Sequence, residues 1–102
     1  MMKKTKQIER IEEMEALMDE CSAGMKDFQK SLRKFSALQK KIDLLEEYYF
    51  SPEWRKDYED DEAGKIPQEV KRGVLSQDGV YDLLGENDEI MKKLERFLKR
   101  MK

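Results

Sequence analysis

Residues 11–35 have the sequence IEEMEALMDECSAGMKDFQKSLRKF, and this stretch decides the fold. Its apolar residues are separated by alternating steps of three and four, at Ile11, Met14, Met18, Cys21, Met25, Phe28, Leu32 and Phe35. This spacing is typical of the a and d positions of an amphipathic helix that pairs with another helix. We therefore predict one long helix over about residues 5–50.

The chain around Ser22-Ala23-Gly24 offers an alternative, an αα-hairpin made of residues 7–21 and 25–49. The step from Cys21 to Met25 keeps the helical phase across the glycine, whereas a turn would be expected to reset it. A single glycine inside a helix costs only about 1 kcal/mol. The sequence therefore favours a continuous helix.

Beyond Phe35 the apolar row changes position on the helix. Gln39 and Glu46 occupy the next a positions, and the apolar row continues at Leu38, Ile42, Leu45 and Tyr49. A straight helix drifts by about 20° per heptad against a strict 3.5-residue repeat. We therefore expect the helix to contact different partners along its length.

The sequence after residue 50 predicts shorter helices. Ser51 and Pro52 favour a helix start, and that helix should run to about Glu62 and stop at Gly64. A further short segment is expected from Ile66-Pro67 to Gly73.

Two more helices are predicted after Gly73. Ser76 with Asp78 should cap one that ends at Gly85, and an Asp78-Gly79 hairpin is disfavoured because its strands would be too short. Asn87 should cap a C-terminal amphipathic helix that packs back on the long helix, with the apolar face Ile90, Leu94, Phe97, Leu98 and Met101. The whole chain, residues 1–102, is predicted to be a single all-α domain.

The composition excludes most familiar active sites. Of 102 residues, 43% are charged and 38% hydrophobic, none is histidine and one is cysteine. Zinc sites of His and Cys, disulfide frameworks and Ser-His or Cys-His pairs cannot be assembled within one such chain. We expect no catalytic residues, no cofactor and no enzymatic activity.

An acidic run at residues 57–62 suggests a metal site at first sight. Asp57, Glu59 and Asp61 are spaced like the first ligands of a calcium loop, but Glu62 and Gln68 stand where the loop needs Gly and Glu. Acidic residues on a solvent-exposed helix face are the simpler interpretation, and we predict no metal site.

The N-terminus is basic, but residues 7–13 contain Gln, Glu and Arg where a signal peptide needs an apolar core. No stretch approaches the roughly 18 apolar residues of a membrane span. The protein is expected to be cytoplasmic, with no membrane partner and with Cys21 as a packed hydrophobe in a reducing compartment.

Charge is distributed unevenly around a net value of −2. Residues 51–70 hold three basic and seven acidic residues, whereas residues 92–102 hold six basic residues and one acidic residue. The basic end could bind phosphates, so a small regulatory protein that binds nucleic acid is the alternative function. The sequence pI near 5.3 and the absence of a recognition-helix motif disfavour it.

Aromatic residues concentrate at the predicted corner between the first two helices. Five of the nine fall within eleven residues: Tyr48, Tyr49, Phe50, Trp54 and Tyr58. Packing at the corner is the favoured explanation, and a ligand or peptide pocket is the alternative.

A helix of this length extends beyond what a compact chain of this size covers, and a solvent-exposed apolar row usually marks an association site. The alternative is that residues 51–102 fold back along enough of the helix to close the core within one chain. We predict a homodimer formed through the long helix, and a function as an interaction or scaffold protein. The candidate interaction surface comprises Ile11, Met14, Met18, Met25, Tyr48, Tyr49, Trp54 and Tyr58.

Two motifs resemble those of a known family. The first is Tyr48-Tyr49-Phe50-Ser51 with Trp54, Asp57 and Glu59, and the second is Gly73-Val74-Leu75-Ser76-Gln77-Asp78, after a helix that opens with Ile8-Glu9-Arg10-Ile11. The pattern is similar to a family of small bacterial proteins catalogued only as a domain of unknown function. The resemblance implies a helical, cytoplasmic, bacterial protein, and it supplies no catalytic residues.

Overall fold

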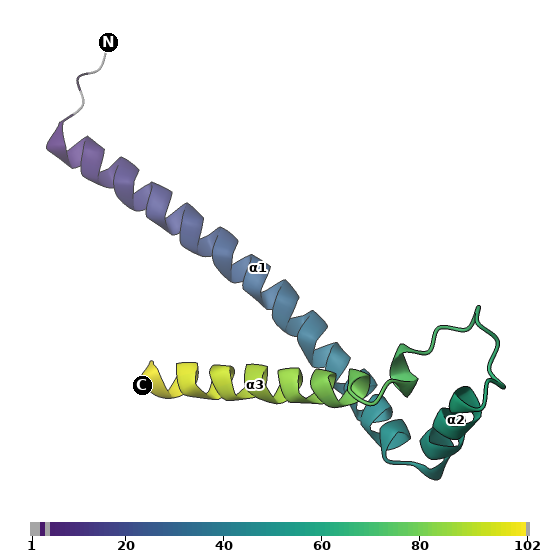
Figure 1. Ribbon diagram of the computed structural model, residues 1–102. Coiled ribbons are helices and arrows are strands. Elements are labelled where there is room, and N and C mark those ends of the chain that lie inside the picture. The colour runs from purple at the N-terminus through teal and green to yellow at the C-terminus, as the bar shows by residue number, and fades with distance from the viewer. Residues whose placement is uncertain (1–2, 4, 102) are drawn as a thin grey trace. The chain divides into compact units, whose positions relative to one another are not determined.

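The computed structural model describes residue 3 and residues 5–101, and this part of the chain is helical without strands (Figure 1). Its elements are helices α1 (Lys6–Tyr49), α2 (Pro52–Glu62) and α3 (Gly79–Arg100), with a 3-10 turn η1 (Gly73–Leu75) before α3. The prediction of an all-α chain with a long N-terminal helix is confirmed. Lys102 of the basic end, and residues 1, 2 and 4 of the basic N-terminus, lie outside the described residues.

The chain divides into two compact units, Met1–Leu38 and Gln39–Lys102. In its described part the first unit is the N-terminal portion of α1. The second contains the last turns of α1 together with α2, η1 and α3. The single domain over residues 1–102 stays a prediction.

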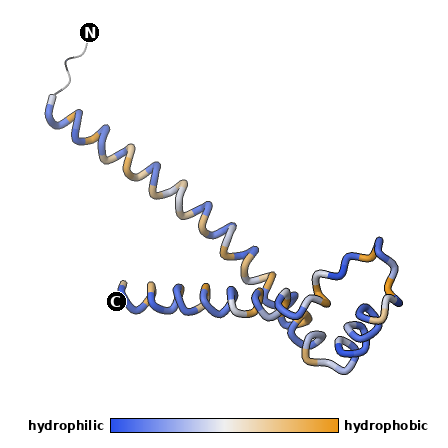
Figure 2. Tube along the Cα trace, viewed as in Figure 1, coloured by the Kyte–Doolittle hydropathy of each residue, from blue (hydrophilic) through white to orange (hydrophobic). Residues whose placement is uncertain are grey.

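Helix α1 runs through Ser22-Ala23-Gly24 without interruption, so the alternative hairpin is wrong. The apolar residues keep their helical spacing across Gly24, and the small cost of a glycine inside a helix is not enough to break it. Along the whole of α1, hydrophobic residues recur at intervals among hydrophilic ones (Figure 2). None of its described side chains is buried.

The core of the second unit is small. Among the described residues, Leu75 and Val80 are the ones that are buried, with 8% and 4% of their surface exposed. The last turns of α1 present the half-buried Ile42, Leu45 and Tyr49, as the shifted apolar row predicted. The row begins with half-buried Gln39, whereas Leu38, in the first unit, is 46% exposed.

Two predicted elements are wrong. Residues 66–72 form turns and bends, so the short segment expected from Ile66-Pro67 to Gly73 is not a helix; the Val70 N–H donates to the Pro67 carbonyl at 3.1 Å. Ile66 and Val70 are the only apolar residues besides Pro67 in this segment, and Val70 is 49% exposed, so a helix there would bury little apolar surface. Gly73 opens η1 rather than ending a helix.

The two helices expected on either side of Gly85 are one helix, α3. Gly85 adjoins open space and is tolerated in the helix interior. Asn87 caps nothing, because its side chain bonds to Gln39 instead. Ser76 does act near the start of the helix: its hydroxyl accepts the Gly79 N–H at 3.0 Å, and the hairpin alternative is wrong.

Candidate functional site

The corner between α1 and α2 is built around Ser51. The Ser51 Oγ accepts the N–H of Trp54 at 3.3 Å and donates to the carbonyl of Tyr48 at 2.6 Å. Pro52 occupies the first turn of α2, where its missing N–H costs no hydrogen bond. The predicted role of Ser51 at the start of α2 is confirmed, and the same side chain also ties the end of α1 to it.

We call the aromatic residues at this corner the aromatic elbow (Tyr48, Tyr49, Phe50, Trp54 and Tyr58), and all of these rings except Tyr48 are connected by ring contacts. Trp54 stacks on Tyr58, with ring centroids 5.2 Å apart and planes at 17°. Tyr49 meets Trp54 edge to face at 5.0 Å and Phe50 at 5.1 Å. Trp54 and Tyr58, four residues apart, thus form one ridge on α2.

The polar ends of these rings hold η1 and the segment between η1 and α3. Trp54 Nε1 donates to the Val74 carbonyl at 2.7 Å, and the Tyr49 hydroxyl donates to the Gln77 carbonyl at 3.3 Å. Gln77 Nε2 donates in turn to the Tyr58 hydroxyl at 3.1 Å. The rings are thus used in packing and in holding a turn, which is the favoured explanation of the aromatic concentration.

Tyr48 is bonded differently from the other rings of the elbow. Its hydroxyl donates to Asp57 Oδ2 at 2.6 Å. Burial, the hydrogen bond to Asp57 and the negative charge of that carboxylate raise the pKa of Tyr48 to about 12. Each effect favours the protonated phenol, so the bond to Asp57 persists well into the alkaline range.

This shift predicts how stability depends on alkaline pH. Below pH 10, the ordinary pKa of tyrosine, the phenol is protonated in both states and its contribution is fully present. As pH rises from 10 through about 12, the unfolded chain loses this proton first, so folding stability falls. Tyr48→Phe should lose less stability than wild type across this window, although it is less stable at neutral pH by about 1 kcal/mol.

Denaturant unfolding at a series of pH values measures this difference. Tyr81→Phe is the matched control, because Tyr81 is 66% exposed and lies outside the aromatic elbow. That variant should follow the wild-type curve. If Tyr48→Phe also follows it, the assigned role of the Tyr48–Asp57 bond is wrong.

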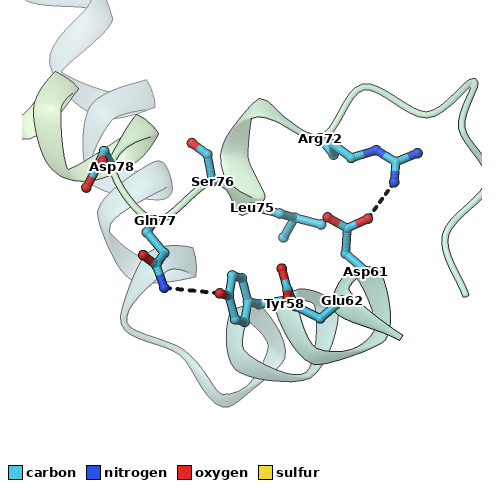
Figure 3. Close-up of a pocket in the computed structure, with 8 residues that line it drawn as sticks. All are labelled: Tyr58, Asp61, Glu62, Arg72, Leu75, Ser76, Gln77 and Asp78. Atoms are coloured by element: carbon cyan, nitrogen blue, oxygen red, sulfur yellow. Dashed lines mark hydrogen bonds and ion pairs between the residues drawn. The ribbon is translucent and has the colours of Figure 1, made fainter. Parts of the chain in front are cut away.

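An open cavity of about 450 Å³ lies beside the elbow (Figure 3). It is lined by Tyr58, Asp61, Glu62, Arg72, Leu75, Ser76, Gln77 and Asp78. Arg72 Nη1 donates to Asp61, and its Nη2 donates to the Pro67 carbonyl at 2.6 Å. The one cationic side chain of this lining is therefore directed to a neighbouring carboxylate and to the backbone.

The carboxylates of the acidic run bond to several different side chains. Asp57 accepts from Tyr48, Asp61 pairs with Arg72, and Asp60 lies 3.3 Å from Lys56 Nζ and 3.8 Å from Lys65 Nζ. Within residues 3 and 5–101, no group of three or more acidic or cysteine side chains converges as metal ligands would. The calcium-like spacing of Asp57, Glu59 and Asp61 is thus not matched by convergence in space.

The candidate interaction residues fall into two groups, one in each unit. Tyr48, Tyr49, Trp54 and Tyr58 lie in the elbow. On α1 the candidate positions are largely exposed: Ile11 by 53%, Met14 by 52%, Met18 by 59% and Met25 by 63%.

Sequence reasoning missed one pair of residues. Gln39 Nε2 donates to Asn87 Oδ1 and Asn87 Nδ2 donates to Gln39 Oε1, both at 3.0 Å. This reciprocal amide pair joins α1 to α3, and both side chains are half-buried. The available signal was a polar residue interrupting an apolar row on each helix, which is typical of positions that fix register.

Comparison with known proteins bears on the identity of the chain. A family model described as a domain of unknown function (DUF4298) matches residues 11–98. The chain belongs to this family. Members of DUF4298 are thus expected to share the region of residues 11–98, which contains the apolar residues of α1, the aromatic elbow and most of α3. No curated protein and no solved structure matches the chain.

The helices were also compared with the requirements of a membrane span. In the described part of the chain, no helix has a stretch that is both long and apolar enough to cross a bilayer. The bacterial origin and the compartment stay predictions.

Proposed function

We propose that the protein is a non-catalytic helical interaction module that self-associates through α1. The surface is the α1 stripe, which we define as Ile11, Met14, Met18, Cys21, Met25, Phe28 and Leu32. The exposure of this stripe carries the proposal: Phe28 is 56% exposed, Leu32 44% exposed, and Cys21 is also exposed. An apolar row of this length usually marks an association surface.

Helix stability gives a second argument. Most of the stability of helices in proteins comes from packing an apolar face against another element rather than from intrinsic helix propensity. The described part of the first unit is one helix, which cannot cover its own stripe. A second copy would supply that packing, and two-fold dimers are the commonest homo-oligomers.

The alternative, nucleic-acid binding through the C-terminal helix, has weaker support. The last turns of α3 carry Lys92, Lys93, Arg96, Lys99 and Arg100. Asp88, Glu89 and Glu95 are interspersed with them, so residues 88–100 have a net charge of only +2. A net charge this small gives little of the phosphate attraction that dominates such binding.

Light scattering after size exclusion tests the proposal. We expect a mass twice that of the 12.2 kDa chain at micromolar concentration. The mass of a single chain across the accessible concentration range would contradict self-association. A binding assay with DNA and RNA at low salt tests the alternative, which predicts retention that falls steeply as salt is added.

A charge placed in the stripe should weaken the dimer. Met18→Lys would bury an ammonium group at the interface, so we expect dissociation to become easier by about tenfold or more. Ala16→Lys is the matched control, because it adds the same charge two residues away on the opposite side of α1. Equal masses for the two variants at every concentration would remove Met18 from the interface.

A further inference from the structure

We infer that α1 pairs with α1 of a second copy in the antiparallel sense, with the two-fold axis crossing the interface at the level of residue 23, midway between Cys21 and Met25. The inference rests on the proposed self-association and specifies its geometry. Two features of the described helix carry it, the distribution of charge along α1 and the sizes of the side chains in the α1 stripe.

The charge of α1 changes sign along its length. Residues 9–20 contain six acidic residues and one basic residue, whereas residues 26–37 contain four basic residues and one acidic residue. The net charges of the two segments are therefore −5 and +3. They lie at equal distances on either side of Ala23, in one uninterrupted helix.

Pairing direction decides which charges meet. A parallel dimer sets each segment beside its own copy, so that −5 faces −5 and +3 faces +3. An antiparallel dimer about Ala23 sets each acidic segment beside a basic one at both ends. Packed helices lie 8–10 Å apart, close to the Debye length of about 8 Å at physiological ionic strength, so these charges are only partly screened.

The α1 stripe fits the same axis. Positions equidistant from Ala23 pair Cys21 with the partner's Met25, Met18 with the partner's Phe28, and Met14 with the partner's Leu32. Each of these layers joins a methionine to a different side chain, so that neither the cysteines nor the phenylalanines face each other. A parallel dimer would instead contain a layer of two cysteines and, two layers away, a layer of two phenylalanines, which gives more uneven packing.

The consequence is an interface of stated composition. The apolar layers run from Met14 to Leu32 on each copy, flanked by an acidic and a basic segment that exchange places between the two copies. The occupant of the α1 stripe is therefore a second copy of this chain, in one orientation.

Disulfide trapping in the full-length chain tests the orientation. In a Cys21→Ala background, Met14→Cys and Leu32→Cys are made as separate single-cysteine proteins. Met14 is 52% exposed and Leu32 is 44% exposed, so neither substitution creates a cavity in a core. Each protein alone and an equimolar mixture are oxidised mildly and separated by non-reducing electrophoresis.

The antiparallel pairing predicts a cross-linked dimer in the mixture and single chains in each protein alone, because a disulfide needs Cα atoms within about 7 Å. Cross-linking of each variant to itself would overturn the inference and leave self-association standing. The absence of cross-links in all samples would overturn this pairing. Light scattering on those samples then distinguishes the two failures, since a doubled mass refutes only the geometry and a single-chain mass refutes the proposed function.

Discussion

Trp54→Ala is expected to lower the melting temperature of the protein by about 10–20 °C, the largest effect of any substitution in the elbow. The change removes the stack on Tyr58, the edge contact with Tyr49 and the hydrogen bond to the Val74 carbonyl. Truncating a core aromatic costs about 3–5 kcal/mol, and Trp54 is only half-buried, so we expect about 2–3 kcal/mol. In a chain this small, each 1 kcal/mol corresponds to about 4–8 °C.

Trp54→Phe separates the ring from its N–H group. That variant keeps an aromatic face and loses the donor to Val74, so the expected cost is about 1 kcal/mol. Thermal unfolding followed by far-UV circular dichroism measures both variants. A shift below about 2 °C for Trp54→Ala would mean that the elbow does not hold the second unit together.

Gly79→Ala should destabilise the protein by about 1–3 kcal/mol, through overpacking rather than through lost contacts. A Cβ at Gly79 would lie 2.6 Å from the Gly73 carbonyl oxygen and 2.6 Å from Ser76 Oγ. The serine hydroxyl is fixed because it accepts the Gly79 N–H and donates to the Gly73 carbonyl. Relief of the clash would have to move η1, which carries the buried Leu75.

Gly85→Ala is the matched control in the same helix. Its Cβ would meet nothing within 4 Å, and alanine is the better helix former, so we expect a gain of about 0.5–1 kcal/mol. Urea unfolding of the two variants should move the midpoint in opposite directions. Midpoint shifts of the same sign in the two variants would show that the close contacts at Gly79 do not determine the stability change of Gly79→Ala.

The elements that sequence predicted correctly are those with local signals. The apolar spacing that fixes α1 and the Ser51-Pro52 start of α2 each lie within one helix or one turn. The Trp54–Tyr58 ridge was predictable for the same reason, because residues four apart lie on one helix face.

The errors come from contacts between distant residues. Asn87 has the sequence preferences of a helix cap, but its side chain bonds to Gln39, 48 residues away, and α3 continues through it. The bonds from Trp54 to Val74 and from Gln77 to Tyr58 could not be predicted either, because they join residues 20 and 19 apart across turns whose course the sequence does not fix. The α1 stripe was visible in the sequence, but sequence periodicity alone does not say which copy or partner covers it.

The amide pair of Gln39 and Asn87 also has a consequence for the order of folding. The contacts at the Ser51 corner span three residues and those of Trp54 with Val74 span 20, whereas the amide pair closes a loop of 48. Loop-closure entropy makes the longest loop costlier than the 20-residue one by about 0.8 kcal/mol. The elbow should therefore form before α3 docks, so that elbow variants slow folding and variants of the amide pair speed unfolding.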